Sequence, residues 1–201
     1  MQAGSLELVD STLSGNSARE DGGGVALTGG ALTSFNSTLA DNLADGDGNG
    51  SGNGGGISQT GNAAVGLKHT LLASNRDGSS GTQSPDCAGT IASTGYNLIG
   101  VTQGCTVTAQ EGDRFNIEAR IGLLADNGGA SLTHALLTGS PGIDGGDPAG
   151  CFNASAQVIV VDQRGFARPR DGDGDEIARC DIGAYELQPA QIDPIFAAGF
   201  E

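Results

Sequence analysis

The sequence predicts an all-β protein, a parallel β-helix with an irregular C-terminal cap, and an internal repeat is the main reason. Residues 35–42 (Phe-Asn-Ser-Thr-Leu-Ala-Asp-Asn) largely repeat residues 9–16 (Val-Asp-Ser-Thr-Leu-Ser-Gly-Asn), which lie 26 positions earlier. Each copy is followed by a glycine triplet and a β-branched residue, and a weaker third copy occupies residues 68–75. Repeat periods of about 20–50 residues are typical of solenoids and related arrays.

The repeated unit consists of short extended pieces. Residues 6–8 and 32–34 alternate one face with the other, as strands do, and no stretch shows a sustained helical stripe. Gly, Asn, Asp and Ser separate these pieces, and they adopt turn conformations at low cost. A unit of this kind cannot bury its apolar face alone, so successive rungs must stack.

The copies align without gaps over their apolar positions, which predicts the stacking register. Three columns of apolar or small residues result: Leu6, Leu32 and Val65; Leu8, Ser34 and Leu67; Leu13, Leu39 and Leu72. Asn16, Asn42 and Asn75 also align, which predicts a ladder of side-chain amides along the stack.

The chain divides into three regions. We expect β-helix rungs over residues 1–110, a capping region of the same domain over 111–187, and a tail over 188–201. Met1 is followed almost at once by strand residues, without the capping segment that natural solenoids carry. We therefore expect the chain to be the C-terminal part of something longer, with any export signal in the missing part.

Charge narrows the range of partners. The chain carries 24 acidic and nine basic residues, for a net charge of −15. Phosphate backbones and anionic membranes require clustered cations, so we expect no nucleic-acid partner and no membrane insertion by this segment. An acidic surface suits calcium and soluble extracellular proteins, and we expect a monomer.

Four cysteines support export from the cytoplasm. They lack the Cys-x-x-Cys spacing of zinc and redox sites, and they allow three pairings. We predict Cys87–Cys105 and Cys151–Cys180, because each pair brackets one structural unit and closes a short loop. Such loops stabilise by roughly 3–4 kcal/mol in the chain-entropy model.

A set of motifs over roughly residues 86–187 resembles one known family. The motifs are Gly-Tyr-Asn-Leu-Ile-Gly (95–100), Leu-Ala-Asp-Asn-Gly-Gly (124–129), Thr-His-Ala-Leu-Leu (133–137), Gly-Ser-Pro-Gly-Ile-Asp (139–144), Asp-Gln-Arg-Gly-Phe-Ala-Arg-Pro (162–169) and Cys-Asp-Ile-Gly-Ala-Tyr-Glu (180–186). They resemble the bacterial choice-of-anchor Q surface proteins, whose bodies are right-handed parallel β-helices. The resemblance implies a secreted or cell-surface bacterial protein and implies no particular reaction. Residues 195–201 are also similar to a short C-terminal tail on some exported bacterial proteins.

The two arginines of the motif at 162–169 suggest a structural role. The segments around Arg164 and Arg168 could meet the segment that contains Asp181 and Glu186. A guanidinium binds a carboxylate with two parallel hydrogen bonds, so we expect these arginines to hold the cap together. Binding of a substrate is the alternative interpretation.

Residues 171–176 (Asp-Gly-Asp-Gly-Asp-Glu) form a candidate calcium loop. Asp171, Asp173 and Asp175 occupy positions 1, 3 and 5 of an EF-hand-type loop, and the carbonyl of Ile177 occupies position 7. The bidentate Glu of position 12 is absent, so Asp181 or Glu186 would have to replace it. A solvated acidic turn is the alternative.

Two classes of function fit the sequence. The first is a non-catalytic extracellular module, such as a stalk, an adhesin or a matrix-contact passenger that binds a polysaccharide or another surface ligand. The second is a pectate-lyase-like polysaccharide lyase or glycosidase, since that fold also carries such enzymes. The first is favoured because no pair of aspartates falls inside a strand, as a hydrolase requires. His69 and His134 are interpreted as structural residues.

Overall fold

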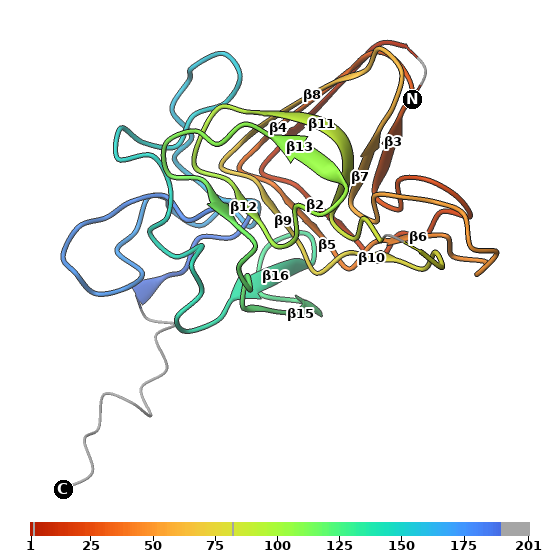
Figure 1. Ribbon diagram of the computed structural model, residues 1–201. Coiled ribbons are helices and arrows are strands. Elements are labelled where there is room, and N and C mark those ends of the chain that lie inside the picture. Colours follow the sequence, from red (N-terminus) through yellow and green to blue (C-terminus); the bar gives the residue numbers. More distant parts are fainter. Residues whose placement is uncertain (2, 82, 190–201) are drawn as a thin grey trace, which may run out of the picture.

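The computed structural model describes residue 1, residues 3–81 and residues 83–189, and this part of the chain is all-β (Figure 1). The expected tail at 188–201 lies outside the described residues except for its first two. The strands are β1 (Ser5–Val9), β2 (Thr12–Ser14), β3 (Val25–Leu27), β4 (Ala31–Phe35), β5 (Thr38–Ala40), β6 (Leu43–Ala44), β7 (Ile57–Gln59), β8 (Ala64–Lys68), β9 (Leu71–Ala73), β10 (Arg76–Asp77), β11 (Cys87–Ser93), β12 (Leu98–Ile99), β13 (Cys105–Val107), β14 (Arg114–Phe115), β15 (Ile121–Ala125) and β16 (Thr133–Leu136).

Parallel pairing between successive passes of the chain builds the first two thirds of the molecule. A seven-stranded sheet in the order β1-β4-β8-β11-β7-β3, with β13 also paired to β11, curls into half a barrel. A second sheet has the order β14-β12-β9-β5-β2, and β6 pairs with β10. Figure 1 shows β4, β8 and β11 side by side, as stacking of successive passes requires.

The register predicted from the sequence alignment is confirmed. Leu6 pairs with Leu32, and Leu32 pairs with Val65. In the second sheet, Leu13, Leu39 and Leu72 pair in turn. Because successive side chains of a strand point to opposite faces, this register places the apolar side chains of successive passes above one another. The buried core inside the stack contains Leu27, Leu32, Leu39, Ile57, Leu67, Leu72, Ile91 and Ile99, each at most 2% exposed.

The predicted amide ladder is also present and includes one residue that the alignment did not contain. The backbone N–H and the Nδ2 of Asn16 both donate to Oδ1 of Asn42, at 3.1 and 2.9 Å. Asn42 donates to Oδ1 of Asn75 in the same way, at 3.0 and 2.9 Å. Asn75 in turn donates to Oδ1 of Asp86, at 3.0 and 2.9 Å. The ladder therefore satisfies polar groups at the turn after each of β2, β5 and β9.

Both predicted disulfides are present, Cys87–Cys105 and Cys151–Cys180. The first joins the start of β11 to the start of β13, and the second lies in the C-terminal part of the chain. Disulfides of this kind form and persist in oxidising, extracellular environments. Within the described residues, no helix has the length and the apolar character that crossing a membrane requires.

The C-terminal region does not take the place that we expected for an end cap. We assigned residues 111–187 to a cap, but β14 still extends the second sheet at Arg114–Phe115. Residues 119–187, which we call the cover, lie against the outward face of that sheet. The Thr12 hydroxyl donates to Oε1 of Gln163 at 2.6 Å, and the amide of Ala184 donates to the Thr38 hydroxyl at 3.1 Å. The cover therefore reaches the first pass as well as later ones and runs along the side of the stack, as Figure 1 shows.

The reason for this position is that the second sheet has an apolar inward face and, at β9 and β12, an apolar outward face as well. Its inward side chains belong to the core of the stack, whereas its outward side chains form a second core with the cover. This second core contains Leu71, Ala73, Leu98, Ala119, Leu136, Ile182, Tyr185 and Leu187. A strand that reads Leu-Leu-Ala, as β9 does, cannot leave either face in water without cost.

We predict that the substitution Asn42→Ala destabilises the protein more than Asn16→Ala does. Asn42 is fully buried, and its loss would remove the acceptor of the Asn16 amide and the donor to the Leu13 carbonyl, whereas Asn16 is exposed at the end of the ladder. An unsatisfied buried polar group costs about 1–3 kcal/mol. Urea unfolding measures both changes in the free energy of unfolding. Equal losses for the two variants would contradict the ladder as a source of stability.

Candidate functional site

The stack and the cover meet where the chain passes from the first sheet to the second. Strands β1, β4 and β8 each end at a residue with positive φ: 44° at Asp10, 47° at Asn36 and 49° at His69. Asp and Asn adopt this left-handed conformation more easily than most residues, so Asp10 and Asn36 favour the corner in the first two passes. We call the following set the corner junction: Asp10, Asn36 and His69 of the stack with Asp147, Phe152 and Arg168 of the cover.

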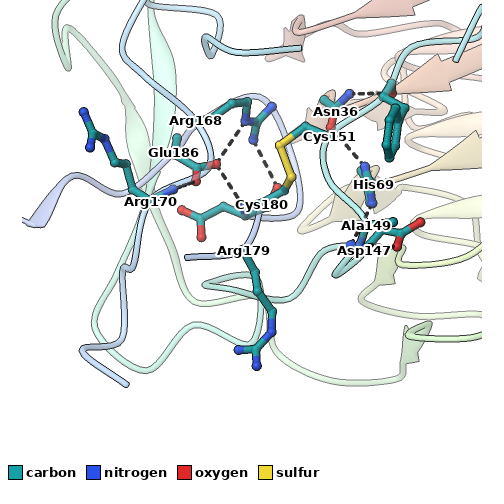
Figure 2. The surroundings of a disulfide bond; sticks show 12 residues. Asn36, His69, Asp147, Ala149, Cys151, Arg168, Arg170, Arg179, Cys180 and Glu186 are labelled. Atoms are coloured by element: carbon teal, nitrogen blue, oxygen red, sulfur yellow. Dashed lines mark hydrogen bonds and ion pairs between the residues drawn. A yellow bond between two sulfur atoms is a disulfide. The ribbon is translucent and has the colours of Figure 1, made fainter. Parts of the chain in front are cut away.

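His69 connects the two sides of the corner junction through both ring nitrogens (Figure 2). Its Nε2 accepts a hydrogen bond from the amide of Asp147 at 2.9 Å, so Nε2 carries no proton. The neutral ring therefore carries its proton on Nδ1, which donates to Oδ1 of Asn36 at 3.1 Å. Nδ2 of Asn36 donates to the carbonyl of Phe152 at 3.1 Å. The side-chain amide of Asn36 and the imidazole of His69 thus form a continuous chain of hydrogen bonds between the stack and the cover.

Burial lowers the pKa of His69 from its ordinary value of 6.5 to about 3. The positive charges of Lys68 and Arg168 lower it further, and Asp147 opposes them. Protonation of Nε2 would also place two N–H groups against each other where His69 now accepts the amide of Asp147. The structure therefore holds this histidine neutral, and its geometry is that of a fixed hydrogen-bonding link rather than of a proton carrier.

Arg168 is the central cation of the corner junction and uses all three of its nitrogens. Nε donates to Oε2 of Glu186 at 3.0 Å, and Nη1 donates to Oδ1 of Asp10 at 3.0 Å. Nη2 donates to the carbonyls of Asp181 and Gly183, at 3.1 and 3.0 Å. The guanidinium is fully buried. The expected contact between Arg168 and Glu186 is therefore present, and Asp10 is an anchor that the sequence did not reveal.

Asp10 is held by Arg168 and yet has a raised pKa. Burial raises the pKa of Asp10 from 3.8 to about 6, and the Arg168 charge and hydrogen bond only partly oppose this shift. The side chain keeps 20% of its surface exposed. A carboxyl with this pKa can act as a general acid near neutral pH, but one of its oxygens is committed to Arg168.

Arg164 finds a different carboxylate from the one that we expected. We anticipated Asp181 or Glu186, but its Nε and Nη2 bind Oδ2 of Asp162, at 2.9 and 2.7 Å. Its only bond to Glu186 goes to the backbone carbonyl, at 2.6 Å. The guanidinium also stacks on Tyr185, at 3.6 Å from the ring centroid. Asp162 lies two residues before Arg164, so this pair is formed locally and the expectation of a long-range pair is wrong for Arg164.

Asp181 and Glu186 bind backbone amides with their carboxylates. Asp181 accepts from the amides of Asp144 and Leu187, at 2.8 and 2.6 Å. Glu186 accepts from the amides of Asp181 and Arg170, at 3.0 and 2.7 Å. Burial, together with the charge of Glu186, raises the pKa of Asp181 well above its usual range. Burial also raises the pKa of Glu186, while Arg168 opposes that shift. The two side chains fix the loops of the cover around Arg168.

The acidic loop at 171–176 brings together a set of carboxylates that differs from the expected one. The three that approach one another, with one oxygen each within 4.8 Å of the others, belong to Asp144, Asp171 and Asp173. Asp175 instead forms an ion pair with Arg179 at 3.3 Å, and it accepts the amide of Ile177 at 2.8 Å. Three oxygen ligands are fewer than the six to eight that calcium takes. Calcium binding here stays a prediction.

His134 ties the cover to the first pass in a second place. Its Nδ1 donates to the carbonyl of Gly122 at 2.8 Å, so its Nε2 is the acceptor for the Ser14 hydroxyl, also at 2.8 Å. The ring is 2% exposed. His134 is therefore a satisfied structural histidine, as we expected. Its contact joins β16 to the exposed end of β2.

A cavity of about 590 Å³ opens in the cover, between β16 and the chain near Leu187. Its walls are largely apolar, and Asp173 is the one charged residue among those that line it. The principal apolar lining residues are Leu136, Leu137, Ile143, Tyr185 and Leu187. Such walls give hydrophobic contact but no pair of groups for acid–base chemistry.

Comparison of the chain with protein-family models, with curated proteins and with solved structures found no match.

Several residues of these sites could not be chosen from the sequence. Asp10 follows a strand at a repeated corner position, and this position is the signal that could have found it. Asp86 lies in a loop without a distinguishing pattern, and Asp144 ends the motif at 139–144, which indicated a family but no role for its carboxylate. Asp147 contributes its backbone amide to His69. No side-chain pattern indicates a backbone donor.

We predict that His69 makes the protein less stable as the pH falls from 6.5 towards 3. In this window the unfolded chain binds a proton that the folded ring excludes, so the free energy of unfolding falls by about 1.4 kcal/mol per pH unit from this group. Asp10 has the opposite effect between pH 6 and 3.8, because its folded pKa is raised.

The comparison with His69→Asn isolates the histidine, because Asn occupies the equivalent corner position 36 and does not titrate. Urea unfolding at a series of pH values should show a smaller loss of stability on acidification for the variant than for the parent protein. Parallel curves for the two proteins would show that the folded ring binds a proton as readily as the unfolded one, which would contradict the prediction.

We predict that millimolar calcium raises the melting temperature, since binding would relieve repulsion among Asp144, Asp171 and Asp173. Affinity should lie in the weak extracellular range of roughly 10⁻⁴–10⁻³ M. Thermal melts with calcium and with EDTA measure the shift, and Asp173→Asn should abolish it. Asp47→Asn, which alters an exposed acidic loop elsewhere, is the control. An unchanged melting temperature in the parent protein would refute calcium binding.

Proposed function

We propose that this chain is a non-catalytic module of an extracellular or cell-surface protein, built as a right-handed parallel β-helix. Two parallel sheets whose strands pair between successive passes support this architecture. Crossovers between parallel strands of one sheet are right-handed in almost all proteins, which supports the hand. Two disulfides support an oxidising environment. The module acts as a stalk, an adhesin or a matrix-contact passenger that presents a surface without converting a ligand.

Membership of the choice-of-anchor Q surface proteins is part of this proposal. Its support is that the motifs of the resemblance coincide with the contacts that attach the cover. The motif at 162–169 supplies Arg164 and Arg168, and the motif at 180–186 supplies Asp181 and Glu186. Motif residues that make such contacts have a structural role and not a catalytic one. Bacterial origin follows from the resemblance alone.

The observation that carries the non-catalytic proposal is the commitment of the buried charged groups to structure. Arg164 and Arg168 are bound by carboxylates and carbonyls of the chain itself. Among the described residues, every buried side-chain nitrogen and oxygen has a hydrogen-bond partner. An active site usually contains polar groups whose bonds are completed by the substrate. Here the chain completes them.

The carbohydrate-active alternative depends on Asp10. This residue is partly exposed, its pKa is about 6, and it lies beside the charge of Asp162. A glycosidase would need a second carboxylate at roughly 5–10 Å across a bound sugar. The group that binds Asp10 is the guanidinium of Arg168, a cation of the buried network, and not a second carboxylate across a sugar site. We therefore give the surface-module function priority.

The proposal predicts binding or indifference towards extracellular glycans, and no cleavage. Acidic and neutral polysaccharides, with and without millimolar calcium, should show neither new reducing ends nor the ultraviolet absorbance of unsaturated products. Cleavage that disappears in Asp10→Asn but persists in Glu7→Gln, a matched change on β1, would replace the proposal with the enzymatic alternative. The protein should also show no free thiols when it is unfolded without a reducing agent and titrated. Free thiols in that titration would contradict the extracellular location.

A further inference from the structure

The hairpin of β15 and β16 presents an open strand edge. These two strands form a separate antiparallel sheet, and among the residues that the structure describes β15 pairs with no strand other than β16. β16 is tied to the stack through His134 and Ser14, and β15 lies at the rim of the molecule in Figure 1. An edge strand carries backbone N–H and C=O groups on its free side that can pair with another extended chain.

The side chains of this edge are unusually apolar for an exposed strand. β15 reads Ile-Gly-Leu-Leu-Ala and contains no charge. Leu123 is 84% exposed, the highest value among the large hydrophobic residues described, and Leu124 is 38% exposed. Natural proteins usually protect edges with charged residues or proline, and neither occurs within β15. The pairing of β15 with β16 does shift between Ile121 and Leu124, which locally bends the strand.

We propose that β15 is a dimerisation edge that pairs antiparallel with β15 of a second copy of this chain, about a twofold axis at Leu123. A twofold interface brings the same patch of both copies together, so the sequence on either side of the axis must be self-complementary. Arg120 precedes β15 and Asp126 follows it, so with Leu123 on the axis each end of the paired strands brings Arg120 of one copy towards Asp126 of the other. Both residues are exposed.

The charges also select this register over its neighbours. If the axis moved to Gly122, Asp126 would face Glu118 of the second copy, and the two negative charges would repel. If it moved to Leu124, Arg120 would face Gly128 and lose its ion pair. Of these three positions of the axis, Leu123 is the one that brings opposite charges together at both ends of the strand. It also brings the exposed leucines of the two copies together.

The two copies join as a four-stranded sheet in the order β16-β15-β15-β16. The interface of one short strand per copy is small, so the dimer is weak and depends on protein concentration. The net charge of −15 on each copy opposes association. Moderate salt screens this long-range repulsion more than it weakens the close ion pairs. This dimer differs from the monomer that we expected from the sequence, and it does not depend on the proposed function.

Sedimentation equilibrium of the chain over a wide range of concentrations, in about 0.15–0.3 M salt, tests the proposal. The mass of the parent protein should rise from that of a monomer towards that of a dimer. Arg120→Glu and Asp126→Arg should each weaken dimerisation by about tenfold, because each creates two like-charge contacts across the axis. The double variant, with both substitutions, should return to within about twofold of the parent protein.

Matched controls separate this register from general charge effects. Arg19→Glu and Asp47→Arg make the same changes of charge in another ion pair, between loops of the first and second passes, and should leave dimerisation almost unchanged. Leu123→Lys should abolish it. Thermal melts confirm that each variant is folded. A parent protein that stays monomeric at every concentration overturns the proposal, and so does a double variant that remains as weak as the single ones.

Discussion

The buried guanidinium of Arg168 is the interaction on which the arrangement of stack and cover depends. It reaches a carboxylate of the first pass, a carboxylate of the cover and two carbonyls between them, all within 3.1 Å. A buried cation is tolerable only when its hydrogen bonds are completed, and here four acceptors complete them. Because Asp10 belongs to the first pass whereas the other three acceptors lie within residues 181–186, all four can surround Arg168 only when the cover lies on the correct side of the stack.

Different interactions hold the two faces of the second sheet: apolar packing on the inward face, and apolar packing together with directional hydrogen bonds on the outward face. Its inward face packs leucines and isoleucines above one another, and such a core tolerates small shifts as long as the volume is filled. Its outward side combines an apolar core with hydrogen bonds of fixed direction, which Thr38, His69 and Asp10 of the stack accept from the cover. We infer that the polar contacts determine where the cover sits, whereas the apolar contacts supply most of the favourable free energy.

The sequence was informative where neighbours in space are related by the repeat. The register of β1, β4 and β8 and the ladder of Asn16, Asn42 and Asn75 follow from the alignment of copies, so they could be predicted. The two disulfides followed from the units that they bracket.

Contacts between unlike segments could not be predicted in this way. Asp10 and Arg168 are 158 positions apart, and no repeated spacing relates them. The lateral position of the cover depends on the apolar outward face of the second sheet, and a three-residue strand is too short for its two faces to be read from the sequence. The expected partners of Arg164 were distant acids, whereas the acid that binds it, Asp162, lies two positions away in the same motif.

The amide ladder has a direction, and this direction restricts how such a protein can grow. Asn16, Asn42 and Asn75 each give two hydrogen bonds to the next member, and Asn42 and Asn75 each receive two from the one before. Asp86 ends the series, because it accepts from Asn75 with one oxygen and from the amide of Val101 with the other. An aspartate side chain has no N–H to pass on, so the relay stops there. A gene duplication that inserts another pass between Asn16 and Asn75 would extend the relay without a break. A pass inserted after Asp86 would receive no hydrogen bond from the Asp86 side chain, which offers only acceptor oxygens. Lengthening by duplication is therefore favoured towards one end of the stack.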